Sequence, residues 1–317
     1  MSGQPIKPDK ILKELGELWT NMGKEEVAGG DDQSHGGGLL RACAMTLISF
    51  VDDEEDPVSL GETLASLMKE HPSRAVVVRV REGEDFLSAR VFAQCWMPFG
   101  QRRQICCEQV EITATVDCLA DVAAIVSPLA VPDLPRVILL RSARVVRSGG
   151  IRKILPLGDK IIVDSSRTGA PGFGELGGLL DAGHIAGDLA WTRITEIRSL
   201  LAQLLESRKI GTVTVEYDGK EAGPEARYLE AWLETSLPDA RVGLKGSGSA
   251  GSGKPLMIRV DGDLTVQLMS GCAEVRIGEL KQRASLPLGA DEELLNAELS
   301  IVVHDRVFER VLNQITA

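Results

Sequence analysis

The chain has 317 residues, of which 44% are apolar and 26% charged, and its 46 acidic residues against 35 lysines and arginines give a net charge of −11. At roughly 150 residues a domain, this length predicts two domains, and the composition is that of a chain that folds. The negative charge disfavours nucleic acids and anionic membrane surfaces as partners. Residues 1–13 contain no apolar leader, and no uncharged run approaches the roughly 18 residues needed to cross a bilayer, so we expect a cytoplasmic protein without membrane contact.

The first predicted element is an amphipathic helix. Within residues 8–22, apolar side chains that include Trp19 recur at helical spacing, with lysines and glutamates largely on the opposite side. Residues 23–38 contain six glycines, a composition typical of a flexible tether. A helix on such a tether can dock in a groove of a partner, or it can pack on its own chain.

A β-α-β unit is predicted next. Residues 41–51 form a nearly continuous apolar run, which is typical of a strand covered on both faces. A helix follows over residues 57–71, with a proline in its first turn and a second proline directly after it. The strand at residues 75–80 completes the unit.

Two segments with period-two alternation, at residues 89–96 and 110–116, predict an antiparallel pair joined across residues 97–103. This pair adds an antiparallel component to the sheet of the first domain. The remaining predicted elements of that domain are a short helix and two strands, at residues 119–125, 137–140 and 160–163.

The second half of the chain also mixes helices and strands. A glycine-rich turn over residues 169–178 precedes a long helix that begins near Asp188, whose carboxylate complements the helix N-terminus. Leu229 and its neighbours mark another helix, and Asp305 caps a last one. Two strands flank Asp261-Gly262-Asp263, which predicts a tight hairpin because glycine tolerates a positive φ.

Together these elements predict an α/β fold with two domains, each a mixed sheet with helices packed on it. We expect the N-terminal helix and tether at residues 1–38, the first domain at residues 39–165 and the second at residues 166–317. Both domains are expected to contain antiparallel pairs, so neither sheet is purely parallel.

Two glycine-rich segments match phosphate-binding loops only in part. Residues 172–177 read Gly-x-Gly-x-x-Gly, but a dinucleotide loop follows its strand at once, whereas residues 165–171 intervene here. Residues 248–254 read Gly-x-x-x-x-Gly-Lys, but Pro255 stands where a hydroxyl residue would hold magnesium, and a strand follows. We expect a turn or helix-packing segment at the first, a flexible loop at the second, and no nucleotide cofactor.

The six cysteines, in a chain without a secretion signal, are expected to be reduced thiols rather than a disulfide framework. Cys106 and Cys107 are adjacent, and Cys95 can lie opposite them on the neighbouring strand. Because adjacent strand residues point to opposite faces, at least one of the pair is expected in the core. The alternative is a redox role for Cys106 or Cys107, which requires an exposed thiolate.

We find no complete catalytic site in the sequence. No Gly-x-Ser-x-Gly elbow marks a nucleophile, each of the four histidines has an adequate structural role, and no cysteine or histidine spacing indicates zinc. The acidic run at residues 52–56 can attract a cation, but we interpret it as a solvated loop before a helix. Several incomplete sites without a complete one are typical of a binding or regulatory protein, so we expect no enzyme activity and no metal.

Several short segments follow one another in a characteristic order along most of the chain. They are Arg41-Ala42-Cys43-Ala44-Met45-Thr46-Leu47, His71-Pro72-Ser73-Arg74, residues 103–109, Val131-Pro132-Asp133-Leu134-Pro135, Asp164-Ser165-Ser166 and residues 187–195 with Arg198. Their ordered set resembles the OpcA-type glucose-6-phosphate dehydrogenase assembly proteins. The resemblance implies a two-domain α/β protein that binds the dehydrogenase and promotes its assembled, active form without itself transferring hydride, and some members are described as redox-responsive.

The resemblance points to a non-catalytic accessory protein of the oxidative pentose phosphate pathway, with glucose-6-phosphate dehydrogenase as its partner and no cofactor of its own. Candidate partner contacts are Trp191, Arg193 and Arg198, because aromatic and arginine side chains give large contact areas and planar hydrogen bonds. Trp19 in the N-terminal helix is a further candidate. Alternatively, Trp191 packs inside its own domain, and Arg193 or Arg198 forms an internal ion pair.

Two other functions are compatible with the sequence. A sensor or enzyme for a sugar phosphate would use Arg141, Arg144 and Arg147, provided that the three side chains converge on one pocket. A thiol-based sensor would use Cys106 or Cys107, and one of them would then have a pKa well below the usual value of about 8.5.

Overall fold

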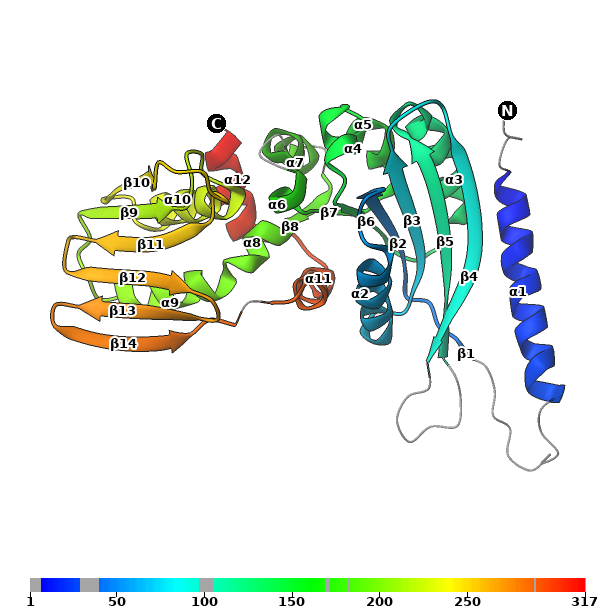
Figure 1. Ribbon diagram of the computed structural model, residues 1–317, viewed down its shortest axis with the longest axis horizontal. Coiled ribbons are helices and arrows are strands. Elements are labelled where there is room, and N and C mark those ends of the chain that lie inside the picture. Colours follow the sequence, from blue (N-terminus) through cyan, green and yellow to red (C-terminus); the bar gives the residue numbers. More distant parts are fainter. Residues whose placement is uncertain are drawn as a thin grey trace. The chain divides into compact units, whose positions relative to one another are not determined.

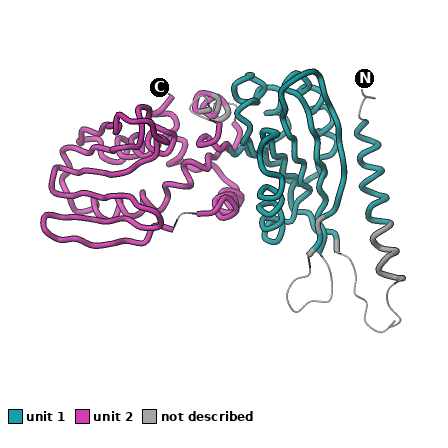
Figure 2. The backbone as a smooth tube through the Cα atoms, in the orientation of Figure 1, with its two compact units in different colours: residues 1–162 teal, residues 163–317 magenta. Residues whose placement is uncertain are grey.

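The chain forms two compact units, Met1–Ile162 and Val163–Ala317, which are coloured separately in Figure 2. Each unit contains a mixed sheet with helices packed on it, so the predicted α/β class is confirmed. The predicted connection at residues 97–103 and most of the predicted tether lie outside the described part of the chain. The computed structural model describes residues 7–28, 40–96, 105–168, 172–181, 183–287 and 289–316.

The sheet of the first unit is built from strands β1 Leu40–Arg41, β2 Met45–Asp52, β3 Ser73–Arg81, β4 Leu87–Trp96, β5 Ile105–Thr115, β6 Arg136–Leu140 and β7 Lys160–Val163. Their order is β1-β5-β3-β2-β6-β7, and β4 pairs with β5 (Figure 1). β2, β3, β5 and β6 run parallel, whereas β4 and β5 are antiparallel, as their period-two alternation predicted. Side chains along β2 and β3 are buried on both faces, which explains their continuous apolar sequence.

The helices of the first unit are α1 Pro8–Ala28, α2 Pro57–Glu70, α3 Leu119–Leu129, α4 Ala143–Arg147 and α5 Ile151–Ile154, with 3₁₀ turns at Val116–Cys118 and Leu155–Leu157. α2 begins where predicted, because the Asp56 carboxylate accepts hydrogen bonds from the backbone N–H groups of Val58 and Ser59. α1 packs on β4 and α3, and α3 packs on β5. Since α1 extends to Ala28, the prediction of a flexible tether was wrong for residues 23–28.

The second unit contains strands β8 Ile185–Asp188, β9 Thr212–Tyr217, β10 Arg241–Gly246, β11 Pro255–Val260, β12 Leu264–Met269, β13 Cys272–Ile277 and β14 Leu280–Ser285. Its sheet has the order β10-β9-β11-β12-β13-β14 (Figure 1). β10 and β9 are parallel and every other neighbouring pair is antiparallel. The predicted hairpin joins β11 to β12, and Asp261 and Gly262 both have a positive φ at its turn.

The helices of the second unit are α6 Ser165–Thr168, α7 Gly172–Asp181, α8 Leu189–Arg193, α9 Thr195–Leu205, α10 Pro224–Ser236, α11 Asp291–Ser300 and α12 Arg306–Thr316. The Asp188 carboxylate caps α8 through the N–H of Ala190, as predicted. The helix after it is interrupted at Ile194, so α8 and α9 replace the single long helix that was expected. The predicted turn was wrong for residues 172–178, because α7 begins at Gly172. Its Phe173 and Leu176 are buried, so the alternative of a helix-packing segment is correct there, and residues 169–171 lie outside the described residues.

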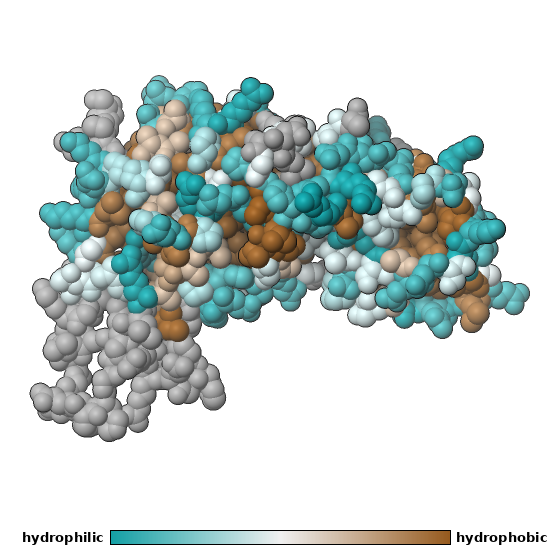
Figure 3. Space-filling view, turned by 180° about the vertical axis from the view of Figure 1, so that it is seen from behind, coloured by the Kyte–Doolittle hydropathy of each residue, from teal (hydrophilic) through white to brown (hydrophobic). Residues whose placement is uncertain are grey.

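On the face drawn in Figure 3, hydrophilic residues cover much of both units, and patches of apolar residues lie among the hydrophilic ones. Among the described residues, no helix combines the length and the apolar composition that a membrane span requires.

The glycine-rich loop before β11 is held in place by backbone hydrogen bonds. The N–H of Gly223 donates to the carbonyl of Gly253 over 2.9 Å, and the N–H of Gly253 donates to the carbonyl of Asp218. The carboxylate of Asp218 also accepts a bond from the N–H of Ser252 over 3.0 Å. The glycines therefore permit a close backbone approach, and the segment leads into a strand as the sequence indicated.

We expect Gly253→Ala to destabilise the second unit by more than about 1 kcal/mol. Gly253 has a φ of +75°, and a Cβ atom there would collide with the backbone nitrogen of Gly223. The matched control is Gly243→Ala in β10, whose Cβ would meet nothing within 4 Å. Urea unfolding measures both variants, and equal unfolding free energies would show that the loop does not require glycine at residue 253.

Candidate functional site

Two separate segments of the second unit converge on the guanidinium group of Arg193. Asp164, which follows β7, is fully buried and accepts two hydrogen bonds from Arg193, over 2.8 and 3.2 Å. Arg193 also donates to the hydroxyl of Ser166 over 2.8 Å and lies 3.5 Å from the carboxylate of Asp291. Burial acts to lower the pKa of Arg193, but the bonds to Asp164 and its charge outweigh burial and raise that pKa.

Asp188 places a second buried carboxyl group beside this ion pair. One of its oxygens accepts hydrogen bonds from the backbone N–H groups of Ser165 and Ala190, over 3.2 and 2.9 Å. The other accepts a bond from the hydroxyl of Tyr228 over 2.8 Å. Burial raises the pKa of Asp188 to about 7 against the opposing effect of these bonds, and burial also raises the pKa of Tyr228 well above its usual range.

Trp191 connects the site to the aromatic core of the second unit. Its ring is only 3% exposed and lies 5.8 Å from Tyr228 and 5.9 Å from Phe308. Its indole N–H donates to the carboxylate of Asp305 over 3.3 Å. The guanidinium of Arg198 lies 3.4 Å above the same ring, a cation–π contact.

Arg198 is a cation with few hydrogen-bond partners. It donates to the hydroxyl of Thr195 over 3.0 Å, but its Nε has no partner among the described residues. Burial lowers the pKa of Arg198 to about 10, and the negative charge of Asp305 opposes that shift. The half-buried guanidinium is therefore positioned by Trp191 more than by a carboxylate.

The fold brings together three of the residues that the sequence suggested as partner contacts. Trp191, Arg193 and Arg198 are neighbours, but Trp191 is buried and Arg193 is in an internal ion pair, which matches the alternative interpretation of these two residues. A partner role for the three residues stays a prediction. The sequence analysis missed Tyr228 and Asp291, because nothing in the spacing of single polar residues indicates that they meet Asp188 and Arg193.

A cavity of about 470 Å³ opens beside Arg193 in the second unit. Its wall is largely apolar and includes Ile197, Leu256 and Leu268, with Lys254 and Glu225 as further charged groups. Two serines, Ser252 and Ser270, also line it, and no histidine is among its described lining residues. The geometry suits binding through apolar contact and a few charges, because Arg193 is already neutralised by Asp164.

The arginines that a sugar-phosphate site would use are engaged by the acidic run at residues 52–56. Arg144 contacts the carboxylates of Asp52, Glu54 and Glu82, and Arg141 lies 2.9 Å from Glu55. The carboxylate of Glu54 forms two hydrogen bonds of 2.5 Å with Arg144, and its pKa falls to about 2 as a result. This pairing disfavours the alternative of an arginine-lined phosphate pocket. Asp53, Glu54 and Asp56 are nevertheless exposed in the loop before α2, as the interpretation of a solvated loop predicted.

Arg147 does not join that cluster. Its side chain is exposed in α4, one turn after Arg144. Of the three arginines considered, two are thus structural cations bound to the acidic run, and the third faces solvent.

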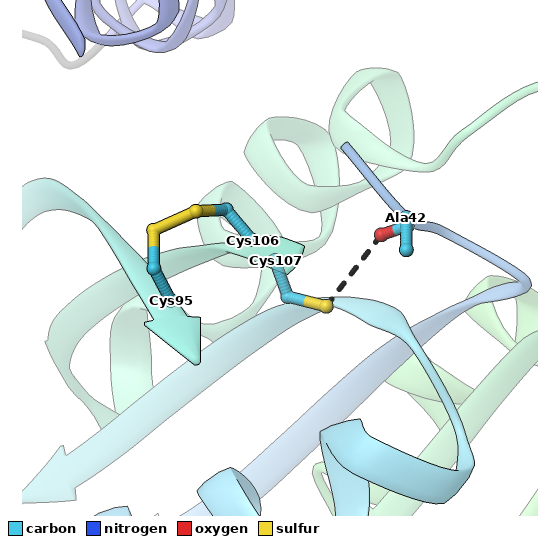
Figure 4. Close-up of a disulfide and its surroundings, with 4 residues drawn as sticks. All are labelled: Ala42, Cys95, Cys106 and Cys107. Carbon is cyan, nitrogen blue, oxygen red and sulfur yellow. Dashed lines mark hydrogen bonds between the residues drawn. A yellow bond between two sulfur atoms is a disulfide. The ribbon is translucent and has the colours of Figure 1, made fainter. Parts of the chain in front are cut away.

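Two of the six cysteines, Cys95 and Cys106, form a disulfide bond. Cys95 of β4 and Cys106 of β5 are directly opposite in register and form a disulfide bond, so the expectation of reduced thiols was wrong for this pair (Figure 4). Cys107 points to the other face, where it is fully buried and its thiol donates to the carbonyl of Ala42 over 3.5 Å. Burial raises the pKa of Cys107 to about 11, which contradicts the low pKa that a thiolate sensor would need.

Trp19 is used within the first unit. Its indole N–H donates to Glu108 over 2.6 Å, and Arg41 lies over its ring at 5.7 Å. Glu108 is buried and also pairs with Arg41 and Arg74. The helix α1 therefore packs on its own chain, which was the second of the two expectations.

The remaining motifs hold no ligand set in the described part of the chain. The Gly-x-Gly-x-x-Gly segment lies inside α7 rather than before a helix, and Gly248 to Lys254 form the loop that precedes β11. Among the described residues, no three histidine, cysteine or acidic side chains are grouped as metal ligands.

Two family models match the chain, one in each half. The model described as the glucose-6-phosphate dehydrogenase subunit N-terminal domain, of the OpcA type, matches residues 65–175. The model described as the corresponding C-terminal domain matches residues 185–312.

Two curated relatives bear the name OxPP cycle protein OpcA. The protein from Synechocystis sp. is 22% identical, over 65% of this chain and 45% of its own length. The protein from Nostoc punctiforme is 26% identical, over 53% of this chain and 38% of its own length. The chain thus spans less than half the length of each of these curated relatives.

Solved structures with a similar backbone fold have lower sequence identity to this chain than the curated relatives have. A biliverdin reductase of Synechocystis, solved with biliverdin and NADP+, is 8% identical with a TM-score of 0.48, covering 85% of this chain and 96% of its own. An oxidoreductase from Sinorhizobium meliloti is 10% identical with a TM-score of 0.41, covering 84% and 86%. At these TM-scores, neither likeness supports a statement about the chemistry of this chain.

The buried carboxyl of Asp188 gives folding a pH dependence with a defined sign. Its pKa is about 7 in the folded chain against an ordinary value of 3.8, so the folded state holds an extra proton between these values and loses stability as the pH rises. Relative to Asp188→Asn, we expect the unfolding free energy of the wild type to fall by up to about 1.4 kcal/mol per pH unit across this window.

Urea unfolding at a series of pH values between 4 and 7 measures this difference. Asp239→Asn, at an exposed turn before β10, is the matched control and is expected to keep the pH dependence of the wild type. A constant difference between the wild type and Asp188→Asn over the window would contradict the raised pKa of Asp188.

The cysteines are expected to differ in reactivity. With a pKa of about 11 and a buried sulfur, Cys107 should resist alkylation by iodoacetamide near pH 8 in the native chain and react after unfolding. The half-buried Cys272 serves as the comparison. Mass spectrometry without reductant should also recover a linked Cys95–Cys106 peptide pair, and native labelling of Cys107 as fast as that of Cys272 would contradict the buried position.

Proposed function

Because the chain belongs to the OpcA family of glucose-6-phosphate dehydrogenase subunits, we propose that it binds glucose-6-phosphate dehydrogenase and promotes assembly of the active enzyme. It acts in the oxidative pentose phosphate pathway, in the cytoplasm, as an accessory protein. The observation that carries the proposal is the pair of family models, which match residues 65–175 and 185–312 in the same chain.

Binding alone is sufficient for such a role. A protein that binds one conformational or assembly state of an enzyme more tightly shifts the population toward that state by the difference in affinity. A preference of about 1.4 kcal/mol changes the population ratio about tenfold. No bond needs to be made or broken by the accessory chain itself.

The arrangement of charged groups supports a non-catalytic role. Asp164 is bound by Arg193, the acidic run is bound by Arg141 and Arg144, and Asp188 is bound by backbone N–H groups and Tyr228. These groups are neutralised or hydrogen-bonded inside their own units. They stabilise the fold and leave contact with a partner to exposed surface.

The candidate partner contacts differ in how much of each side chain is exposed. Arg193 and Arg198 are partly exposed and Trp19 is half-buried, so each can add a limited contact area. The buried ring of Trp191 packs against the guanidinium of Arg198, so its contribution to partner binding is to hold Arg198 in position. A shallow contact on the second unit would use the partly exposed planar guanidinium of Arg198.

The test combines the purified chain with purified glucose-6-phosphate dehydrogenase. We expect the velocity of the dehydrogenase to rise and the mass of its complex, measured by light scattering after size exclusion, to increase. Arg198→Gln should weaken this effect, whereas Arg306→Gln, at a highly exposed arginine of α12, is the matched control and should leave it unchanged.

An unchanged velocity and an unchanged mass would contradict the proposal. Turnover by this chain alone, or tight binding of a sugar phosphate to it, would instead favour a sensor or an enzyme. Calorimetry with glucose 6-phosphate and the isolated chain measures that alternative directly.

A further inference from the structure

All charged side chains of strands β9 to β14 lie on one face of the second unit's sheet. The register pairs Arg241 with Thr212, Lys245 with Glu216, and Arg259 with Thr214, and residues paired in register share a face. Farther along the sheet, Thr265 pairs with Arg259 on one side and with Arg276 on the other. Arg276 in turn pairs with Lys281, and Glu274 pairs with Arg283.

This face has the opposite charge to the chain as a whole. The six described strands carry six lysines and arginines and only two carboxylates there, Glu216 and Glu274, whereas the chain has a net charge of −11. An excess of four positive charges is thus confined to one side of one sheet. The rest of the chain is correspondingly more acidic.

The two carboxylates are each shared by two cations. Glu216 pairs with Lys245 and Arg259, and Glu274 pairs with Arg276 and Lys281. Each group of three therefore keeps one net positive charge. These four cationic side chains are 50% to 70% exposed, so their charge is available at the surface.

Arg241 and Arg283 contribute the remaining positive charge at the two edge strands. Arg241 lies on β10 and Arg283 on β14, and both side chains are exposed. Neither forms an ion pair with a described residue. The basic face, defined by Arg241, Lys245, Arg259, Arg276, Lys281 and Arg283, thus spans the sheet from one edge to the other.

The opposite face of the same sheet contributes to the core of the unit along β9, β11, β12 and β13, whereas Leu280 of the edge strand β14 is exposed there. Val215, Ile258 and Val266 are paired neighbours there and are fully buried, and α10 packs against β9 and β10. The alternate residues Gln267 and Met269 lie with the basic face and are exposed. The basic face is consequently a free surface of the folded unit.

We propose that this basic face is the surface through which the chain docks onto an acidic surface of glucose-6-phosphate dehydrogenase, an inference that rests on the function proposed above. Complementary potentials steer two proteins together and fix their relative orientation. An acidic partner surface attracts the basic face and repels the rest of this negatively charged chain. The two effects together orient the encounter, because the chain approaches with its basic face forward.

The composition of the face favours a protein over a nucleic acid as its occupant. Between the cations lie Thr212, Thr214, Thr265, Gln267 and Met257, and no aromatic side chain is available on its described residues for stacking against bases. The arginines and lysines of the face are separated by uncharged side chains, so they can form ion pairs with separate carboxylates on the surface of a folded protein.

The experiment compares the wild-type chain with three variants for binding to purified glucose-6-phosphate dehydrogenase, by calorimetry at low and at raised salt. The test variant is Arg241→Glu with Arg283→Glu, which breaks no ion pair of the described residues. The matched control is Arg152→Glu with Lys153→Glu, an equal charge change at two exposed residues of α5. Arg241→Gln with Arg283→Gln gives a milder variant, should the reversal disturb folding.

We expect the dissociation constant of the wild type to rise with salt. The charge reversal should raise it at least about tenfold, the neutral pair should have a smaller effect, and the control should change it less than about twofold. Equal binding by the wild type and both test variants would overturn this docking surface while leaving the proposed function in place. No binding by the wild type would overturn both.

Two further outcomes would assign the face to another occupant and so overturn the inference. One is binding of a short DNA duplex by the wild type that the charge reversal abolishes. The other is a wild-type dimer, seen by light scattering in the absence of the dehydrogenase, that the charge reversal dissociates.

Discussion

The burial of carboxylates is the constraint on which the arrangement of this chain depends. A carboxylate removed from water must be neutralised or hydrogen-bonded, or its burial costs several kcal/mol. In the second unit, Asp164 meets this requirement with Arg193, and Asp188 meets it with two backbone N–H groups and Tyr228. The residues that supply these partners come from α6, α8 and α10, so the same few bonds fix how those elements pack.

The first unit follows the same rule with different partners. Glu108 is buried on β5 and is bound by Arg41, Arg74 and the indole of Trp19, which ties α1 to the sheet. The acidic run at residues 52–56 caps α2 and binds Arg141 and Arg144. Most of the residues that looked like candidates for chemistry are therefore parts of the internal electrostatics of the fold.

Charged side chains have different roles inside the units and at the surface. Inside each unit, opposite charges are matched one against another, whereas the outer face of the β9–β14 sheet keeps a positive excess on a negative chain. Matched charges stabilise a fold, and unmatched exposed charges govern which surfaces approach each other. A protein whose candidate reactive groups are neutralised internally, and whose surface charge is segregated, is suited to act through contact.

The sequence by itself determined the α/β class, the approximate places of several helices and strands, and the family to which the chain belongs. Apolar runs, period-two alternation and capping aspartates such as Asp188 and Asp305 act over a few residues, so their consequences can be predicted without knowing the rest of the fold. The hairpin at Gly262 and the antiparallel pair of β4 and β5 were correct for the same reason.

Only the tertiary structure decided the long-range pairs. The disulfide of Cys95 with Cys106 depends on strand register, and the ion pairs of Arg193 with Asp164 and of Arg144 with Glu54 depend on which strands and helices become neighbours. The helix α7 forms through burial of Phe173 and Leu176 despite its glycines, because packing outweighs local propensity. Alternation along β9 to β14 is visible in the sequence, but which face remains open to solvent is set by the helices that cover the other one.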